Sequence, residues 1–151
     1  LDHPLISKRR LSSIPKIYVS TKASMLNGQH FWGIPKQLAQ FEWLIHDDVV
    51  YCNICFEQQE MSLCLQKYKH SQIFYVNSHH LPARLLKIDQ AWQGLRYQFT
   101  LQFRGKLSKL KQASWKNTQN IFPDFSHARY LQSFYVPEFS LILPKAKIEK
   151  K

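Results

Sequence analysis

The chain has 151 residues, of which 44% are apolar and 14% aromatic, so it can bury the core of one domain and is not a disordered chain. Lysine and arginine number 21 against 10 acidic residues, and the resulting net charge of +11 would suit a polyanionic partner. The four glycines lack the spacing of dinucleotide- and phosphate-binding loops, which excludes both of those motifs.

Strand patterns predominate along the chain. Short β-branched and aromatic runs predict strands at 16–20, 41–45, 49–57, 61–67, 72–76, 95–104 and 139–143. Residues 95–104 alternate between apolar and polar side chains, and residues 49–67 should form a hairpin around Gln58-Gln59-Glu60. Helical patterns are weaker. They predict a short helix over 35–40 that starts at Pro35, a polar surface loop or frayed helix over 107–119, and a short helical piece over 125–130.

This order of elements predicts a mainly β fold, an antiparallel barrel or double sheet with a few short helices. No stretch approaches the roughly 18 apolar residues of a membrane helix, and no signal peptide is evident. We therefore expect a soluble, cytoplasmic protein without a membrane partner. The cysteines are odd in number, which argues against a secreted disulfide scaffold. Cys52 and Cys55 should point to opposite faces of one strand, so we expect buried thiols rather than half of a zinc site.

The segment from Tyr18 to Leu38 carries the most specific pattern. It reads YVSTKASMLNGQHFWGIPKQL and resembles the acetoacetate decarboxylase family. In that family a strand and a small-residue stretch lead to Gly-Arg-Glu, an aromatic or apolar pair, and Pro-Lys-Lys-Leu. Tyr68-Lys69-His70 and the closing Leu141 to Ala146 also resemble family sequences. The resemblance implies one acetoacetate decarboxylase-like domain over residues 1–151, lacking the family's N-terminal part, and assembly into a homo-oligomer.

By this resemblance Lys36 is a Schiff-base nucleophile. A neutral amine condenses with the ketone of a β-keto acid, and the resulting iminium ion accepts the electrons left when CO₂ departs. Since free lysine has a pKa near 10.4, desolvation or a nearby cation must lower it. We expect an apolar wall around Lys36, made by Phe31, Trp32, Ile34 and Leu38. No metal or organic cofactor is required.

The same segment departs from the family pattern at several positions. Gln37 stands where the family has its second lysine, and Gln29 and His30 stand where it has arginine and glutamate. Ile34 replaces an aromatic residue often found before the proline. We expect the substrate pocket to include Gln29, His30, Trp32, Ile34 and Gln37. Trp32 and Ile34 are compatible with an oxo acid larger or more apolar than acetoacetate.

The sequence therefore predicts a Schiff-base-forming lyase acting on a β-keto acid or related oxo acid. One alternative is a non-catalytic small-molecule-binding relative, which Gln37 favours. A weaker alternative is a basic nucleic-acid-binding module, but the basic residues are spread along the chain and no such motif occurs, so we expect no nucleic-acid partner. His79-His80 should diverge on an extended segment and bind no metal, and His46-Asp47-Asp48 has the composition of a turn.

Overall fold

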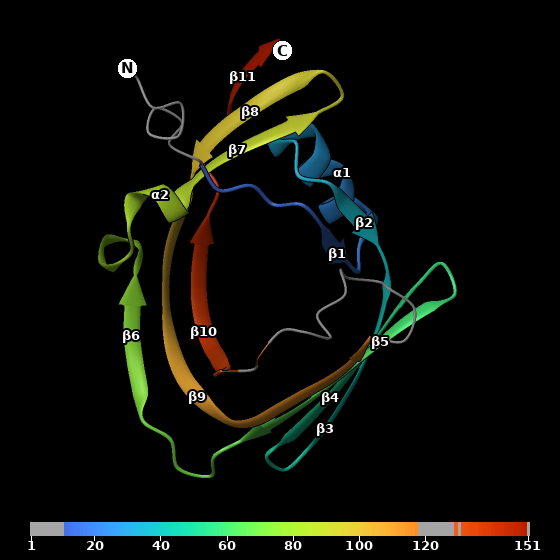
Figure 1. Cartoon of the computed structure of the whole chain (residues 1–151), viewed down its shortest axis with the longest axis vertical. Helices are drawn as coiled ribbons and strands as arrows, with labels where there is room; N and C mark the ends of the chain where they lie inside the picture. The colour runs from blue at the N-terminus through green and yellow to red at the C-terminus, as the bar shows by residue number, and fades with distance from the viewer. Residues whose placement is uncertain (1–10, 118–128, 130, 151) are drawn as a thin grey trace.

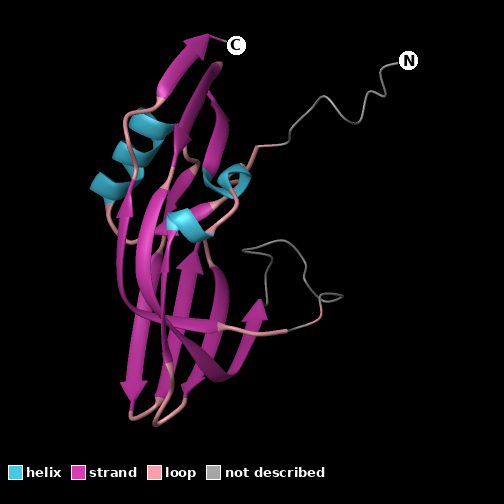
Figure 2. Ribbon diagram, turned by 90° about the vertical axis from the view of Figure 1, so that its left-hand side faces the viewer, coloured by secondary structure: helices cyan, strands magenta, loops and turns pink. Residues whose placement is uncertain are grey.

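The computed structural model describes residues 11–117, 129 and 131–150. It is mainly β and curls into a half-barrel of antiparallel strands with few helices, which confirms the predicted fold class (Figures 1 and 2). In chain order the elements are β1 (Ile17–Val19), α1 (Lys22–Trp32), β2 (Lys36–Leu38), β3 (Gln40–His46), β4 (Val49–Phe56), β5 (Gln59–Lys67), β6 (Ile73–Asn77), η1 (Ser78–His80), α2 (Ala83–Leu86), β7 (Lys87–Trp92), β8 (Leu95–Thr100), β9 (Gln102–Asn117), β10 (Phe134–Ile142) and β11 (Lys147–Lys150).

The largest sheet has the strand order β10-β9-β5-β4-β3, with β6 also paired to β9. One edge of β9 pairs first with β6 and then with β5, because the chain from β5 to β6 runs antiparallel along it. The register shifts by one residue between Gln66 and Lys67 of β5, and again between Tyr135 and Glu138 of β10. Such bulges bend a strand and increase its twist. Both shifts fall opposite the middle of β9, the strand that sweeps around the lower end of the half-barrel in Figure 1.

Strand β9 corrects two predictions. Residues 95–104 are not one strand, because pairing breaks at Leu101, whose N–H donates to the carbonyl of Leu86 at 2.8 Å. Residues 107–117, expected to be a polar loop or a frayed helix, are instead the second part of β9. Their lysine, glutamine and serine side chains show no strand pattern, because backbone pairing with the neighbouring strands specifies this part of β9. The helical piece expected over 125–130 lies, apart from Arg129, outside the described residues.

The unit β1-α1-β2 corrects a third prediction. Residues 36–38 form a strand that pairs parallel with β1, and the helix lies earlier, at Lys22–Trp32. Thr21 caps the helix by accepting a hydrogen bond from the N–H of Ser24, and Gly33 ends it with φ of 59°. A left-handed residue after the last turn is the usual role of glycine at a helix C-terminus. The parallel pair therefore requires α1 as its crossover connection.

Two tight turns join the meander β3-β4-β5. The β4–β5 hairpin was predicted, and its turn falls at Glu57 and Gln58, with φ of 47° and 64°. Of His46-Asp47-Asp48, predicted to be a turn, Asp47 and Asp48 form the β3–β4 turn, and His46 is the last residue of β3. Within the described residues no helix is long and apolar enough to cross a bilayer, and no group of three or more His, Cys, Asp and Glu side chains could hold a metal ion.

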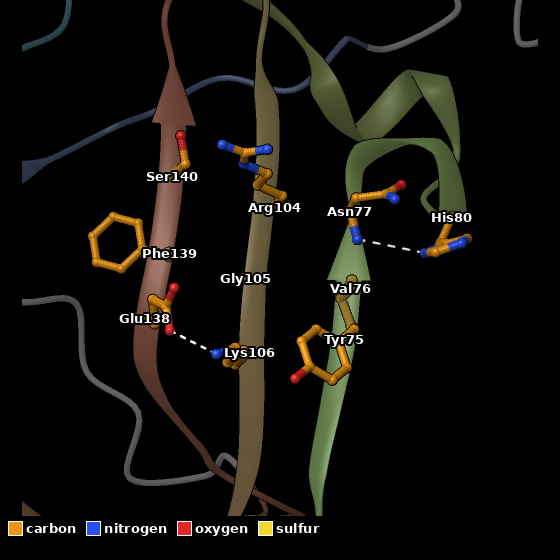
Figure 3. A pocket seen from close by; sticks show the side chains of 10 residues that line it. All are labelled: Tyr75, Val76, Asn77, His80, Arg104, Gly105, Lys106, Glu138, Phe139 and Ser140. Carbon is orange, nitrogen blue, oxygen red and sulfur yellow. Dashed lines mark hydrogen bonds and ion pairs between the residues drawn. The ribbon is translucent and has the colours of Figure 1, made fainter.

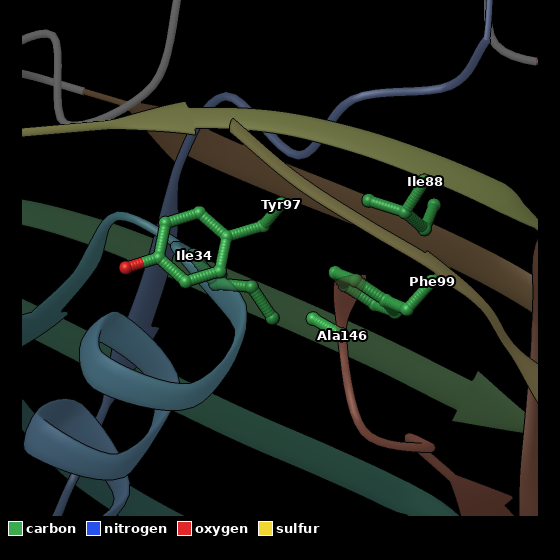
Figure 4. Packing of buried hydrophobic residues seen from close by; sticks show 5 residues of the cluster. All are labelled: Ile34, Ile88, Tyr97, Phe99 and Ala146. Atoms are coloured by element: carbon green, nitrogen blue, oxygen red, sulfur yellow. The ribbon is translucent and has the colours of Figure 1, made fainter. Parts of the chain in front are cut away.

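Two apolar clusters stabilise the fold. The first joins β1, β4 and the segment after β2 through Tyr18, Ala39, Cys52 and Ile54. Cys52 is buried there, and Cys55 points to the other face of β4, as predicted from their spacing. The expectation that both thiols are buried was wrong for Cys55, which is only partly buried. The second cluster packs the turn after α1 against β7, β8 and the segment before β11 (Figure 4). Its buried members are Ile34, Ile88, Tyr97, Phe99 and Ala146.

Candidate active site

Lys36 is the first residue of β2 and is tied by its backbone to the end of α1. Its N–H donates to the carbonyl of Ile34 at 2.7 Å, and the N–H of Ile34 donates to Gly28 at 3.0 Å. The side-chain amide of Gln29 donates to the carbonyl of Lys36 at 2.7 Å. Gln29, one of the residues predicted to surround Lys36, therefore contacts it, but its partner is the backbone carbonyl of Lys36 and not the amine.

The side chain of Lys36 lies along one face of α1. A Cβ placed on Gly28 would stand 2.4 Å from Lys36 Cδ and 2.5 Å from Cε, so the lysine stem occupies the space that a larger residue would fill. One turn earlier on the same face, Ser24 Oγ accepts a hydrogen bond from Lys36 Nζ at 3.2 Å. Glycine at position 28 therefore provides the groove in which the lysine stem lies.

Burial against α1 lowers the pKa of Lys36 below its ordinary value of 10.5. Desolvation is the cause, because removing water disfavours the charged ammonium form. Within the described part of the chain Lys36 forms no ion pair that would oppose this effect. A larger share of its amine is consequently neutral at a given pH than for a solvated lysine.

Gln37 follows Lys36 on β2 and pairs with Tyr18 of β1. Its side-chain oxygen is buried without a hydrogen-bond partner among the described residues. As a neutral amide it adds no positive charge beside Lys36, so desolvation is the sole cause of the lowered pKa. A buried acceptor without a partner destabilises the fold unless another donor reaches it.

The side chains of Trp32 and Ile34 pack in the second apolar cluster. The indole N–H of Trp32 donates to the carbonyl of Pro144 at 2.9 Å, and Ile34 is only 1% exposed. The two segments that carry the resemblance, 18–38 and 141–146, therefore meet in space. Phe31 and Leu38 are about half exposed, at 51% and 45%, and the apolar wall expected from Phe31, Trp32, Ile34 and Leu38 stays a prediction.

His30 is not brought to Lys36. It lies two residues beyond Gly28 on α1, which rotates it by roughly 200° to the other side of the helix. There its ring meets the exposed ring of Phe31 edge-on, with centroids 4.9 Å apart. Tyr68-Lys69-His70 is exposed in the connection after β5. Contact of His30, Trp32, Ile34 and Gln37 with a substrate stays a prediction.

Three residues that contact Lys36 or the turn before it were not predicted from the sequence. Ser24 and Gly28 are four apart, a spacing that places them on one face only once the helix over 22–32 is known. Gln90 of β7 is buried, and its side-chain amide donates to the carbonyl of Gly33 at 3.4 Å. The same side chain also pairs with both backbone groups of Ile14, at 2.6 and 2.9 Å. It thereby fixes the turn that precedes Lys36.

A solved structure of acetoacetate decarboxylase is similar to this chain, with a TM-score of 0.54 and 10% sequence identity. The chain has an acetoacetate decarboxylase-like fold. The match covers 93% of this chain and 62% of that chain, so the present chain spans less than two thirds of its length. No family model matches the sequence, and no curated protein does. At this identity the similarity shows the fold alone.

Proposed function

We propose that this chain is a Schiff-base-forming lyase of the acetoacetate decarboxylase type, with Lys36 as its nucleophile and a β-keto acid or related oxo acid as its substrate. The observation that carries the proposal is the Lys36 amine itself. Desolvation lowers its pKa, and Ser24 Oγ is its hydrogen-bond partner at 3.2 Å. The fold shared with acetoacetate decarboxylase supports the same assignment.

The proposed reaction needs only the lysine amine, a proton donor and water. The neutral amine attacks the ketone carbon and water leaves, forming an iminium ion. The bond to the carboxylate carbon then breaks, CO₂ departs, and the electron pair moves to the iminium nitrogen to give an enamine. Protonation at carbon and addition of water release the ketone and return the free amine. Ser24 Oγ is placed to hold the amine in position between these steps.

Reductive trapping tests this proposal. Incubation with acetoacetate and sodium borohydride should reduce the iminium to a stable adduct that peptide mass spectrometry locates on Lys36. The adduct should be lost in Lys36→Ala and retained in Lys22→Ala, which removes an exposed lysine of the neighbouring helix α1. An equal adduct in Lys36→Ala, or none in the wild-type protein with acetoacetate or with a larger aryl β-keto acid, would contradict the proposal.

Gln37 favours a second candidate, a relative that binds small molecules without catalysis. The resemblance implies a second lysine at this position, and here a buried neutral amide replaces it. Such a protein would bind an oxo acid without forming an adduct. The pH dependence of Lys36 acylation separates the two candidates, because an amine that titrates like ordinary lysine favours the non-catalytic relative.

We also propose that the protein forms a homo-oligomer. Strand β3 ends the large sheet and leaves Trp43, Leu44 and Ile45 more than 60% exposed, at 62%, 63% and 66%. An apolar edge strand favours pairing with another chain. Analytical ultracentrifugation should show an assembly that Ile45→Lys weakens, whereas a monomeric wild-type protein would contradict the proposal.

A further inference from the structure

A cleft of about 430 Å³ lies over β9, between β6 and β10. Figure 3 shows the three strands side by side with the side chains that line the cleft. Its volume is within the range of small-molecule sites in proteins, roughly 300–1,000 Å³. None of its lining residues belongs to β1, α1 or β2, the unit that holds Lys36. The cleft is therefore a different place on the molecule from the proposed lyase site.

The strand register arranges the polar side chains of the cleft in two rows. In one row Lys106 of β9 stands between Tyr75 of β6 and Glu138 of β10. Its amine is 2.8 Å from the carboxylate of Glu138 and 5.7 Å from the centroid of the Tyr75 ring. These contacts show that the three side chains share one face of the sheet. They also show that the charge of Lys106 is already compensated by Glu138.

In the next row Arg104 stands between Asn77 of β6 and Ser140 of β10. Arg104 is two residues from Lys106, so its side chain lies on the same face. In Figure 3 its guanidinium lies on the side of β9 that faces Ser140. Within the part of the chain that the structure describes, neither the guanidinium nor the Ser140 hydroxyl has a hydrogen-bond or ion-pair partner.

We propose that this cleft binds an organic monocarboxylate, with Arg104 as the residue that recognises its carboxylate group. A guanidinium donates two parallel hydrogen bonds to a carboxylate, and the Ser140 hydroxyl supplies a further donor beside it. The exposed ring of Tyr75 offers an apolar surface for the rest of the ligand.

The charge balance of the cleft selects the class of ligand. Lys106 and Glu138 form a neutral pair, which leaves Arg104 as the single uncompensated positive charge of the two rows. A monocarboxylate matches this one charge. A phosphate dianion would need a second free cation, and the carboxylate of Glu138 would repel it.

Benzoate is the probe that tests the proposal, since it joins one carboxylate to an aromatic ring. Titration of the ¹⁵N-labelled protein should shift the amide resonances of Gly105 and Ser140. Arg104→Gln should weaken benzoate binding by about tenfold or more, since hydrogen bonds to charged groups are typically worth about 1.5–3 kcal/mol. Arg84→Gln removes another exposed arginine, outside the cleft, and should leave benzoate affinity unchanged.

Further arms separate this site from the other possibilities. Benzamide, which lacks the charge, should bind far more weakly than benzoate, and Ser140→Ala should weaken benzoate binding without altering the circular dichroism spectrum. Lys36→Ala should leave benzoate binding intact, so failure of the lyase proposal does not affect this one. Equal binding of benzamide, tighter binding of inorganic phosphate, full affinity in Arg104→Gln, or loss of binding in Lys36→Ala would each overturn the proposal.

Discussion

Replacing Gly28 by alanine should change the environment of Lys36 while leaving the protein folded. The new methyl group would stand 2.4 Å from Lys36 Cδ, whereas carbon atoms in contact are about 3.5–4.0 Å apart. The lysine stem must therefore move by roughly 1 Å or more. Because this stem is flexible, we expect it to leave the face of α1 and enter solvent, breaking the bond to Ser24 Oγ.

The expected change in stability is small. Alanine in place of glycine inside a helix stabilises it by about 1 kcal/mol. Exposing one or two methylene groups of the lysine stem opposes this gain, at about 0.8 kcal/mol for each group that had been fully buried. The free energy of unfolding of Gly28→Ala should thus stay within about 1 kcal/mol of the wild-type value. The pKa of Lys36, in contrast, should rise toward its ordinary value of 10.5 because the amine regains water.

Competitive acylation across a pH series, read by mass spectrometry at Lys36 with the exposed Lys22 as internal reference, measures this effect. In Gly28→Ala the pH at which Lys36 becomes reactive should move upward. Asn27→Ala is the matched control, because it also adds an alanine to α1 but at an exposed position. Urea denaturation of the same variants measures stability. An unchanged pH profile for Lys36 in a folded Gly28→Ala protein would refute the reasoning that helix contact desolvates the amine.

Three further outcomes are expected. Burial lowers the pKa of Lys36, so the folded state binds this proton less tightly than the unfolded chain. The protonated lysine therefore destabilises the fold at every pH below the lowered pKa. This destabilisation disappears as the pH rises to 10.5. Lys36→Met should therefore be more stable than wild type at pH 7, by a margin that shrinks toward pH 10.5, in urea titrations at both ends. Ile34→Ala, at a position only 1% exposed, should lower the free energy of unfolding by about 2–5 kcal/mol, and Ile34→Val by about 0.5–1.5 kcal/mol. Trp32→Phe removes the 2.9 Å hydrogen bond to Pro144 and should lower the free energy of unfolding by about 1 kcal/mol, measured by thermal or urea unfolding.

Controls accompany these stability measurements. Lys22→Met removes an exposed lysine and should not reproduce the pH-dependent gain of Lys36→Met. Leu26→Ala, at a position 47% exposed, should lower stability by much less than Ile34→Ala. A Lys36→Met protein that is no more stable than wild type at pH 7 would argue against a desolvated charge, and equal losses in Leu26→Ala and Ile34→Ala would argue against the packing of Ile34.

Strands with apolar or aromatic runs were predictable from the sequence, because side-chain burial specifies them. β1, β3 and the hairpin β4–β5 are of this kind. Helix α1 was missed since its apolar residues form no stripe and only Gly28 is buried. What defines this helix is its ends, Thr21 and Gly33, and both residue types are ordinary end signals. Pro35, which suggested a helix start, instead stands between the helix and β2.

The candidate site was predictable only in part. Lys36 was singled out by resemblance of the segment around it. Its contacts with Ser24 and Gly28 depend on how α1 and β2 lie together, which local sequence does not reveal. Gln90 is 57 residues from Gly33, and a glutamine in a strand gives no sign that it will be buried. Strand β9 shows the same limit, because long-range pairing specifies its second half.

The pairing of β9 also bears on the order in which the chain folds during synthesis. Strands β3, β4 and β5 are neighbours in sequence and can pair as soon as each has emerged from the ribosome. β6 differs, since among the described strands it pairs with β9 alone, and that stretch of β9 follows about thirty residues later. At typical elongation rates of about 5–20 residues per second, β6 stays without its partner strand for a few seconds. During this interval Ile73, Phe74 and Tyr75 form an unpaired apolar segment, which is the kind of surface that chaperones cover during synthesis.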